Sequence, residues 1–300
     1  MVKPHLNIPR VDFMVPGFSK CGTTSLCYLL SEHPDIFIPK KKESNFFVSE
    51  GYCDNWDSYR GFFKDAANQK MLGEGGTFYT GAVSEVKARS AILQHYPNIK
   101  LVFIARDPLD RLESSFREFH HSGAKYGLET PISFDETLRT IPNLLDDTRY
   151  WSRLNNFLKY MEVENIHVLF LEDLMTDADA ELRKCFQFLG VNDDFPLGKK
   201  PPQLNRASSK YYDSNLLRYL RRNILLATTL RRLGIERQNK IAKAIGLRKK
   251  FSGPIEWQES TVTTVVTELA DEVHQFLDYA SKPCDYWPRF THAVNQCGHR

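Results

Sequence analysis

The stretch 11–25, VDFMVPGFSKCGTTS, decides the fold because it passes from a buried strand through a glycine loop into a helix. Its first five residues form a short apolar run, typical of a buried strand, and Pro16-Gly17 ends that run. From Thr23 onward, leucines recur at helical spacing until Pro34 stops the pattern. The order strand, glycine loop, helix predicts an α/β opening unit.

The loop inside this unit carries groups that bind phosphate. Gly17 and Gly22 allow the backbone to curl so that several N–H groups point into one concavity. The start of the helix adds the positive end of its dipole. A tight turn without a ligand is the alternative, but a lysine and three hydroxyls at this junction favour an anion site. We assign to this site Ser19, Lys20, Cys21, Gly22, Thr23, Thr24 and Ser25.

Two features separate this loop from an ATP-binding P-loop. The glycine spacing is the same, but Thr23 stands where such a loop needs a lysine. The later strand 101–105, LVFIA, runs into Arg106 and not into a magnesium-holding aspartate. Because a cation there repels magnesium and attracts phosphate, the two motifs predict a nucleotide with two separated phosphates, bound without metal.

The rest of the chain alternates strands and helices. Lys100–Pro108 and Asn165–Leu174 have strand character, helical patterns flank both, and Gly190 has the place of a helix C-cap. This alternation predicts a single α/β domain over residues 1–300, with a mostly parallel central sheet flanked by helices. Within it we expect a nucleotide-binding core over 11–195 and a covering loop with a helical region over 196–300.

Composition narrows the class of protein. A net charge of +3 is too small to indicate a nucleic-acid partner. The six cysteines form no CxxC pair and match no zinc framework, so we expect reduced, mostly buried thiols. The first ten residues are polar, and no run approaches eighteen apolar residues. We therefore expect no signal peptide, no membrane span and a cytoplasmic location.

Two segments together resemble a known family. PGFSKCGTTSL (16–26) and ARDPLDRLESSF (105–116) are similar to the 5′-phosphosulfate loop and the 3′-phosphate motif of sulfotransferases that use 3′-phosphoadenosine 5′-phosphosulfate (PAPS), especially the carbohydrate-type and bacterial branches. The motifs occur in the family's order with roughly eighty residues between them. Similarity continues in 149–191, and is strong over roughly 11–195. It implies a P-loop-NTPase-like sulfotransferase fold, PAPS as co-substrate, adenosine 3′,5′-bisphosphate as product, and no metal.

The resemblance also implies roles for single residues. Arg106 and Ser114 match the positions that bind the 3′-phosphate, and Arg106 can fork onto a phosphate. The segment LNRASSKYY (204–212) resembles a loop that lies over the nucleotide, with a solvated loop as the alternative. Its candidate ligands are Asn205, Arg206, Ser208, Ser209 and Lys210.

The chemistry needs a cation and a base. Sulfuryl transfer resembles phosphoryl transfer, in which the protein positions groups and neutralises charge, and we assign charge stabilisation on the leaving oxygen to Lys20. The resemblance places the base at Glu43 in PKKKESNFF (39–47). A carboxylate beside three lysines stays ionised unless Phe46 and Phe47 desolvate it. The alternative for Glu43 is neutralisation of the lysine run on a solvated turn.

Two further candidates for the base remain open. Glu74 is the second, and Gly75 follows it where the family often carries a lysine, which suggests more room and no second cation near the acceptor. His120 and His121, beyond Ser114, are the third, although a histidine pair on a helix is more often a packing or surface feature.

The acceptor partner is a sugar, a phenol or a lipid. Segments 44–80 and 117–135 are rich in aromatic residues, which suit sugar rings and phenols but more often form core. Residues 218–250 hold eleven Lys or Arg and a single acidic residue, Glu236, and apolar residues lie between them. This basic amphipathic stretch could face an anionic polymer, a membrane surface or only water. The competing functions are a P-loop-like kinase or NTPase, and a non-catalytic nucleotide-binding protein of the same fold.

Overall fold

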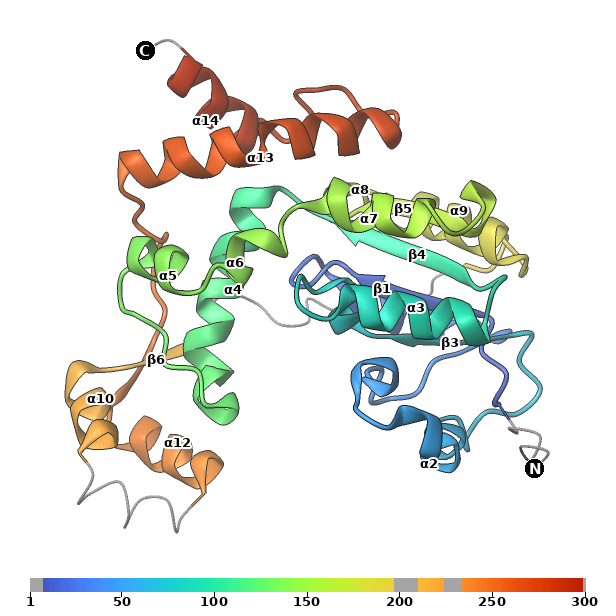
Figure 1. Ribbon diagram of the computed structural model, residues 1–300, viewed down its shortest axis with the longest axis horizontal. Coiled ribbons are helices and arrows are strands. Elements are labelled where there is room, and N and C mark those ends of the chain that lie inside the picture. Colours follow the sequence, from blue (N-terminus) through green and yellow to red (C-terminus); the bar gives the residue numbers. More distant parts are fainter. Residues whose placement is uncertain (1–7, 197–209, 224–233, 299–300) are drawn as a thin grey trace.

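The computed structural model describes residues 8–196, 210–223 and 234–298. Its centre is a five-stranded sheet in the order β2-β3-β1-β4-β5 in which every neighbouring pair is parallel (Figure 1). The predicted α/β fold is thus confirmed. The strands are β1 (Phe13–Gly17), β2 (Ile36–Phe37), β3 (Met71–Gly75), β4 (Lys100–Ala105) and β5 (Ile166–Phe170).

The register places the ends of these strands around the loop after β1. Met14 lies opposite Glu74 on one side and Leu101 on the other. The register against β4 shifts between Met14 and Gly17, where Pro16 has no N–H to give to the ladder. Phe18 resumes the pairing, donating its N–H to the Ile104 carbonyl at 2.9 Å. The loop therefore leaves the sheet at the carboxyl edge, beside the end of β4.

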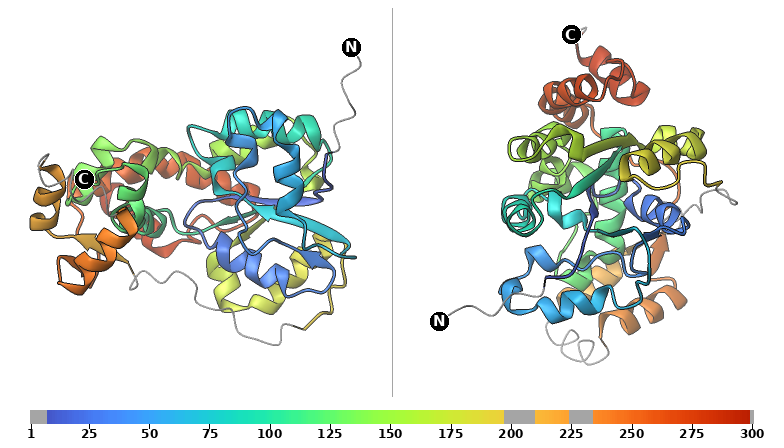
Figure 2. Two further views of the ribbon diagram at one scale, coloured as in Figure 1. Left: turned by 90° about the horizontal axis from the view of Figure 1, so that it is seen from below. Right: turned by 90° about the vertical axis from the view of Figure 1, so that its right-hand side faces the viewer.

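Helices cover both faces of the sheet because successive strand residues point to opposite sides. Along β4, Val102 and Ile104 pack on the α1–α9 side, and Leu101 and Phe103 on the other. Figure 2 shows these two helical layers. The flanking helices are α1 (Thr23–Ser31), α3 (Glu85–His95), α7 (Tyr150–Leu158), α8 (Leu171–Thr176) and α9 (Ala178–Leu189). Gly190 caps α9 in the left-handed conformation, as predicted.

The C-terminal helices belong to the hydrophobic core. Helix α13 (Glu259–Tyr279) buries Leu269 and Phe276 in the same cluster as β1 and β4, and α14 (Pro288–Gly298) follows it. Trp287 stacks on Phe276 with ring centroids 6.1 Å apart. The predicted boundary near 195–196 therefore divides one continuous hydrophobic core, and the subdivision itself stays a prediction.

A smaller unit lies at the far end of α4 (Pro108–Ser122) from the sheet (Figure 1). In this unit β6 (Tyr211–Asp213) precedes α10 (Asn215–Arg222), and β7 (Arg248–Lys250) follows α12 (Ile235–Ala244). The two strands pair in antiparallel orientation. The other described elements are α2 (Trp56–Phe62), α5 (Phe134–Thr140), α6 (Asn143–Asp146) and the 3-10 turns η1 (Phe46–Val48), η2 (Tyr52–Asp54), η3 (Thr77–Thr80), η4 (Gly123–Tyr126) and η5 (Val163–Asn165).

Three expectations need correction. The strand predicted to reach Leu174 ends at Phe170, and α8 takes over its last residues. The basic stretch 218–250 is divided among α10, α12 and β7 in its described parts, and its apolar segment 224–230 lies outside the described residues. Half of the cysteines are buried, not most of them: Cys21, Cys27 and Cys185.

Within the described ranges, no helix has the length and apolar character needed to cross a membrane. The aromatic-rich segment 44–80 is mainly core, as the commoner interpretation had it. Its buried members pack against one another through ring contacts: Phe46, Phe47, Trp56, Tyr59, Phe63 and Tyr79.

Candidate functional site

The loop between β1 and α1 is shaped for an anion. Lys20 and Gly22 both adopt the left-handed conformation, with φ of 65° and 98°. Only glycine fits at position 22, because an added Cβ would lie 2.7 Å from Leu171 Cδ1. The first turn of α1 receives no side-chain cap, so its amides remain directed into the loop. Ser19 and Cys21 lie in the loop, the hydroxyl residues 23–25 form this turn, and their role as anion ligands stays a prediction.

Arg106 lies beside this loop with donor capacity to spare. One Nη donates to the Lys20 carbonyl at 3.4 Å, and the other pairs with Asp110 at 3.3 Å. Its Nε is buried and has no hydrogen-bond partner in the described structure. Ser114 lies two turns along α4 on the half-exposed side. A guanidinium N–H with no partner among the described residues fits a phosphate group.

The ammonium of Lys20 joins a cluster that the sequence did not reveal. Glu118 Oε2 pairs with Lys20 Nζ at 2.9 Å and with Lys210 Nζ at 2.5 Å. Ser122 donates to the other oxygen of Glu118 at 2.7 Å. Glu118 lies one turn beyond Ser114 on α4, so Lys20 pairs with a carboxylate on the same helix as the predicted phosphate ligand Ser114.

Charge and burial act in opposite directions in this cluster. Burial lowers the pKa of Lys20, and Glu118 partly offsets that effect. Burial by itself would raise the pKa of Glu118, but the charge of Lys20 and the hydrogen bonds from Lys210 and Ser122 lower it to about 2. Glu118 is therefore ionised at neutral pH and forms an ion pair with Lys20, the lysine that the sequence assigned to the donor.

Arg111 positions the loop from beneath, and sequence reasoning missed it. Its side chain is 2% exposed, and its Nε donates to the Ser19 carbonyl at 3.2 Å. Nη1 donates to the Leu144 carbonyl at 2.6 Å and to Thr148 Oγ1 at 2.9 Å. All these acceptors are protein groups, so Arg111 is a structural cation that ties the loop to α6. The residue lies five positions after Arg106, and only its burial distinguishes the two roles.

Cys21 also has a structural contact. Its Sγ lies 3.3 Å from the hydroxyl of Tyr150, which donates to the Arg106 carbonyl at 3.0 Å. Burial raises the pKa of the Cys21 thiol to about 11. The thiol is thus a neutral packing group that connects the loop to the end of β4.

Glu43 lies near the loop through its neighbour Lys42. Lys42 Nζ pairs with Glu43 Oε1 at 2.5 Å and lies 3.5 Å from Thr23 Oγ1. The Glu43 side chain is 36% exposed. Phe46 and Phe47 pack into the aromatic core and leave the carboxylate uncovered, so the condition under which these rings would desolvate Glu43 is not met. Glu43 is therefore open to an acceptor.

Lys42 also corrects the expectation of open space at Gly75. A Cβ built on Gly75 would lie 3.3 Å from Lys42 Cδ and 3.5 Å from its Nζ. The Gly75 N–H donates to the Lys42 carbonyl at 2.9 Å, which fixes the two segments together. A cation therefore does lie over position 75, and it comes from the preceding segment of the chain.

Glu74 lies inside the protein. It is fully buried, and its Oε1 accepts from the hydroxyls of Tyr59 at 2.8 Å and Tyr79 at 2.9 Å. Its Oε2 accepts from the Ser44 N–H at 3.3 Å. Burial raises the pKa of Glu74, and these hydrogen bonds oppose the rise. With its oxygens engaged by core groups, Glu74 holds the segment after Glu43 in place.

The two histidines face different surroundings. His120 Nδ1 is 2.9 Å from Arg218 Nη2, and burial together with the charge of Arg218 lowers its pKa to about 3. His121 Nδ1 accepts from the Tyr211 N–H at 3.2 Å, and burial and the charge of Lys210 lower its pKa. Both Nδ1 atoms are engaged within the protein, and the partly exposed side chain of Glu43 favours Glu43 as the base candidate.

Part of the predicted site is not placed. Asn205, Arg206, Ser208 and Ser209 lie outside the described residues. Lys210 is described, and its contact with Glu118 brings the end of the predicted covering loop to Lys20. Among the described residues, no three His, Cys, Asp or Glu side chains gather as a metal-binding group.

Comparison with known proteins agrees with this geometry. The family model described as "Sulfotransferase domain" matches residues 10–202. The membrane-associated sulfotransferase kil1 of Dictyostelium discoideum is 32% identical over 117 residues, 37% of this chain and 23% of that protein. Heparan sulfate glucosamine 3-O-sulfotransferase 5 of Mus musculus is 26% identical over 222 residues, 71% of this chain and 60% of that protein.

A solved structure supports the fold. The sulfotransferase from Alicyclobacillus acidocaldarius superposes with a TM-score of 0.61 at 20% identity, covering 92% of this chain and 98% of that one. The chain spans less than a quarter of the length of the Dictyostelium relative and three fifths of the mouse relative.

Proposed function

The chain belongs to the sulfotransferase domain family, and from that premise we propose that it transfers a sulfuryl group from PAPS to a hydroxyl or amine of an acceptor. One observation carries the proposal. At the carboxyl edge of the parallel sheet, Arg106 lies beside the left-handed loop and donates to the Lys20 carbonyl at 3.4 Å, and its Nε has no hydrogen-bond partner among the described residues. Ligands of open α/β sheets bind at that edge.

The residues present fit a donor with two separated phosphates. The loop amides and the hydroxyls of Thr23 and Thr24 would hold the 5′-phosphosulfate, and Arg106 with Ser114 would hold the 3′-phosphate. When bound, PAPS supplies the sulfuryl group and a leaving phosphate. Lys20 stabilises the negative charge that develops on the leaving oxygen. Lys210 closes the site above Lys20 through their shared partner Glu118.

On the acceptor side, Glu43 accepts the proton of the attacking group. Its carboxylate is accessible, and Lys42 connects it to Thr23 of the donor loop. Positioning of this kind is the main contribution that a protein makes to such a transfer. Lys42 neutralises charge between the donor loop and the base. Its ammonium lies over Gly75, which has no side chain of its own.

For the acceptor class, we propose a carbohydrate before a phenol or a lipid. The support is the mouse relative, which is named a heparan sulfate glucosamine 3-O-sulfotransferase. A screen of sugar, phenol and lipid acceptors with labelled donor tests this order. Labelling of phenols or lipids alone would contradict it.

Calorimetry tests the donor assignment. Adenosine 3′,5′-bisphosphate should bind equally well with and without a metal chelator, and ATP should bind at least about tenfold more weakly. A preference for ATP with magnesium would instead indicate the kinase or NTPase class. Binding of the bisphosphate with no turnover on any acceptor would indicate a non-catalytic nucleotide-binding protein.

A substitution tests the base. Glu43→Gln should leave the affinity for adenosine 3′,5′-bisphosphate nearly unchanged and lower kcat by about 10²-fold or more, because only proton acceptance is lost. Thermal melting of the variant controls for folding. A Glu43→Gln enzyme with the wild-type rate would rule out Glu43 as the base.

A further inference from the structure

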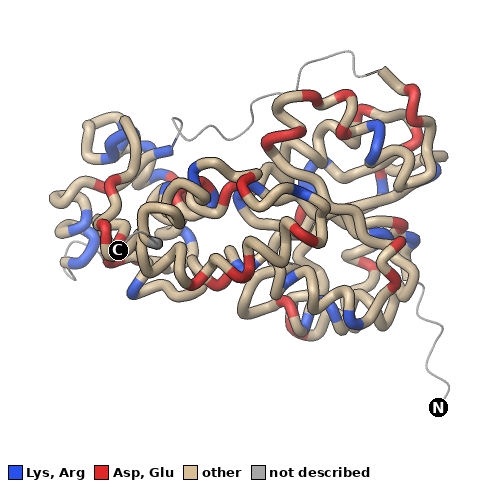
Figure 3. The backbone as a smooth tube through the Cα atoms, turned by 90° about the horizontal axis from the view of Figure 1, so that it is seen from above, with Lys and Arg blue, Asp and Glu red and all other residues tan. Residues whose placement is uncertain are grey.

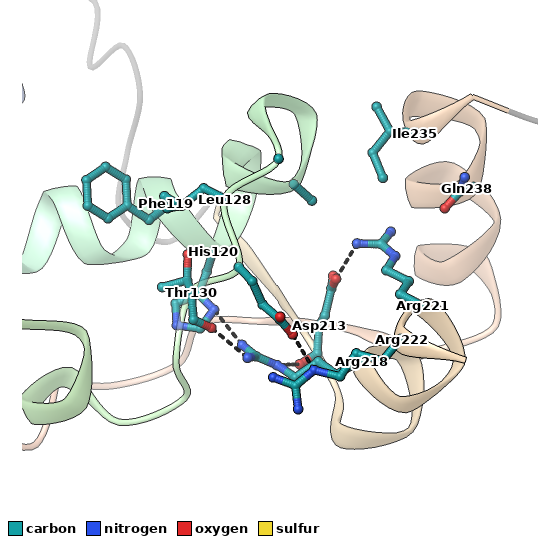
Figure 4. Close-up of a pocket in the computed structure, with 13 residues that line it drawn as sticks. Phe119, His120, Leu128, Thr130, Asp213, Arg218, Arg221, Arg222, Ile235 and Gln238 are labelled. Atoms are coloured by element: carbon teal, nitrogen blue, oxygen red, sulfur yellow. Dashed lines mark hydrogen bonds and ion pairs between the residues drawn. The ribbon is translucent and has the colours of Figure 1, made fainter. Parts of the chain in front are cut away.

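A pocket of about 620 Å³ lies on the side of α4 that faces away from Lys20. The last turn of α4, the segment 124–130, α10 and α12 form its walls (Figure 4). His120 lines it, and Glu118, which contacts Lys20, lies two residues earlier. At 100° per residue these two side chains point to opposite sides of the helix. The pocket is therefore separate from the proposed donor site.

The pocket has an apolar side and a cationic side. Phe119, Leu128 and Ile235 lie along one side in Figure 4. Guanidinium groups of α10 line the other, from Arg218, Arg221 and Arg222. A volume of this size and such a division suit a small amphipathic molecule.

The cationic side has more positive charge than its own acids neutralise. Arg218 donates to the Asp213 carbonyl at 3.2 Å, the Thr130 carbonyl at 2.6 Å and His120 Nδ1 at 2.9 Å. All three acceptors are neutral, since the lowered pKa of His120 keeps its ring uncharged. The half-buried Arg218 therefore has no carboxylate among these hydrogen-bond partners.

The carboxylates that line the pocket are already shared. Asp213 pairs with Arg221 and also with Arg248, at 2.9 Å from the latter. Glu129 pairs with Arg222. Three guanidinium groups and two carboxylates thus line this pocket, and one of these carboxylates also pairs with Arg248, so an incoming anion would restore the balance. Figure 3 shows the Lys and Arg positions gathered at this end of the molecule.

Two buried polar atoms around the pocket have no hydrogen-bond partner among the residues that the structure describes. Thr130 is 5% exposed, and its Oγ1 makes no hydrogen bond to any described residue. The Nε of Arg221 is likewise buried and unpartnered. Buried polar groups in folded proteins are nearly always satisfied, so these two atoms indicate a ligand with polar atoms.

We propose that this pocket binds an amphipathic anion, in which a carboxylate or sulfate meets the arginines of α10 and a sugar ring or short hydrocarbon body rests on Phe119, Leu128 and Ile235. The inference goes beyond sulfuryl transfer and does not depend on it. The anion would be bound on the opposite side of α4 from the donor, leaving both sites available at once.

Matched probes test this chemistry by calorimetry on the full chain. One pair is 4-nitrophenyl glucuronide and 4-nitrophenyl glucoside, and the other is octanoate and octanamide. In at least one pair the anion should bind at least about tenfold more tightly than its neutral match. The pair that shows this difference identifies a sugar or a hydrocarbon body. Equal affinities within both pairs, or no binding, would overturn the proposal.

Variants locate the binding. Arg222→Gln and Arg218→Gln should each weaken the bound anion by about tenfold or more, and Arg218→Lys serves if the glutamine variant fails to fold. Arg237→Gln, on α12 but outside the pocket lining, is the matched control and should change nothing. Phe119→Ala should weaken the anion and its neutral match by a similar factor. Equal losses in the Arg237 control would indicate unspecific attraction and refute the site.

A competition experiment separates this pocket from the donor site. Saturating adenosine 3′,5′-bisphosphate should leave the affinity for the anionic probe unchanged. Displacement of the probe would show that it binds at the donor site, and the proposal would fail. Failure of the bisphosphate itself to bind would contradict the proposed function but leave the result with the probe intact.

Discussion

Glu118 is the residue at which stability and donor binding should change in opposite directions. Its carboxylate pairs with Lys20 and Lys210, two cations at the place assigned to an anionic donor. Glu118→Gln keeps the shape and the contact with Ser122 but removes the charge. We expect the variant to be less stable than the wild type and to bind adenosine 3′,5′-bisphosphate more tightly.

The size of the stability loss follows from the pKa of Glu118. The pKa is lowered from 4.5 to about 2. A difference of this size corresponds to roughly 3 kcal/mol of stabilisation at neutral pH. Because the Glu118 side chain is 28% exposed, solvent screening reduces the expected loss to about 2 kcal/mol. That is a shift in Tm of several degrees for a domain of this size.

The sign of the pH dependence is fixed by the direction of the shift. A carboxylate whose folded pKa is lowered stabilises the protein above its unfolded value, and the contribution disappears as pH falls through the folded value. The difference between wild type and Glu118→Gln should therefore be complete at pH 7. It should shrink by more than half at pH 3, as measured by urea denaturation at both values.

The affinity gain has the opposite origin. Without the carboxylate, Lys20 and Lys210 have no competing partner, and one negative charge next to the ligand is gone. We expect about tenfold tighter binding of adenosine 3′,5′-bisphosphate by calorimetry, with the gain reduced at high salt. Weaker binding, or an unchanged free energy of unfolding at pH 7, would refute the view that Glu118 competes with the donor for these lysines.

The other predictions concern the donor loop and the buried acid. Lys20→Ala should lower kcat on the order of 10²-fold with labelled donor, and a fall in bisphosphate affinity alone would contradict its role in transfer. Arg106→Ala should weaken bisphosphate binding by at least about tenfold, and an unchanged affinity would move the 3′-phosphate elsewhere. Glu74→Gln should cost about 1–3 kcal/mol of stability, because an N–H₂ group that only donates replaces one of the two carboxylate oxygens that accept hydrogen bonds, while the pH profile of kcat stays as in the wild type. A shifted pH profile of kcat would make Glu74 a candidate for the base again.

The geometry of the loop proposed to bind phosphate was predictable because local rules fix it. Gly22 lies in the loop after the first strand, and Arg106 directly follows the strand 101–105, so both can be recognised in the sequence. In the structure, Arg106 donates to the carbonyl of Lys20, two residues before Gly22. Gly190 as a helix cap follows from the same short-range chemistry. At each of these positions, the residue type and its neighbours in sequence determine the conformation.

The contacts that the sequence did not reveal span long separations. Glu118 meets Lys210 across 92 positions, and Arg111 meets Ser19 across 92. No periodicity or turn rule connects such residues, since the path of α4 past the loop brings them together. The core role of α13 was missed for a similar reason, because its apolar residues reveal an amphipathic helix but not the surface that it covers.

Lys42 supplies a cation beside Gly75, the position at which the sequence departs from the family pattern. In the sequence, Gly75 stands where the family often carries a lysine, which predicts that the site lacks this cation. In the folded chain, the ammonium of Lys42 lies 3.5 Å from the Cβ position of residue 75. A side chain at 75 would collide with Cys27 Sγ at 2.8 Å and press on Lys42 Cδ at 3.3 Å. The glycine is therefore the condition for Lys42 to lie there, and the two positions have to be read as one feature of the site.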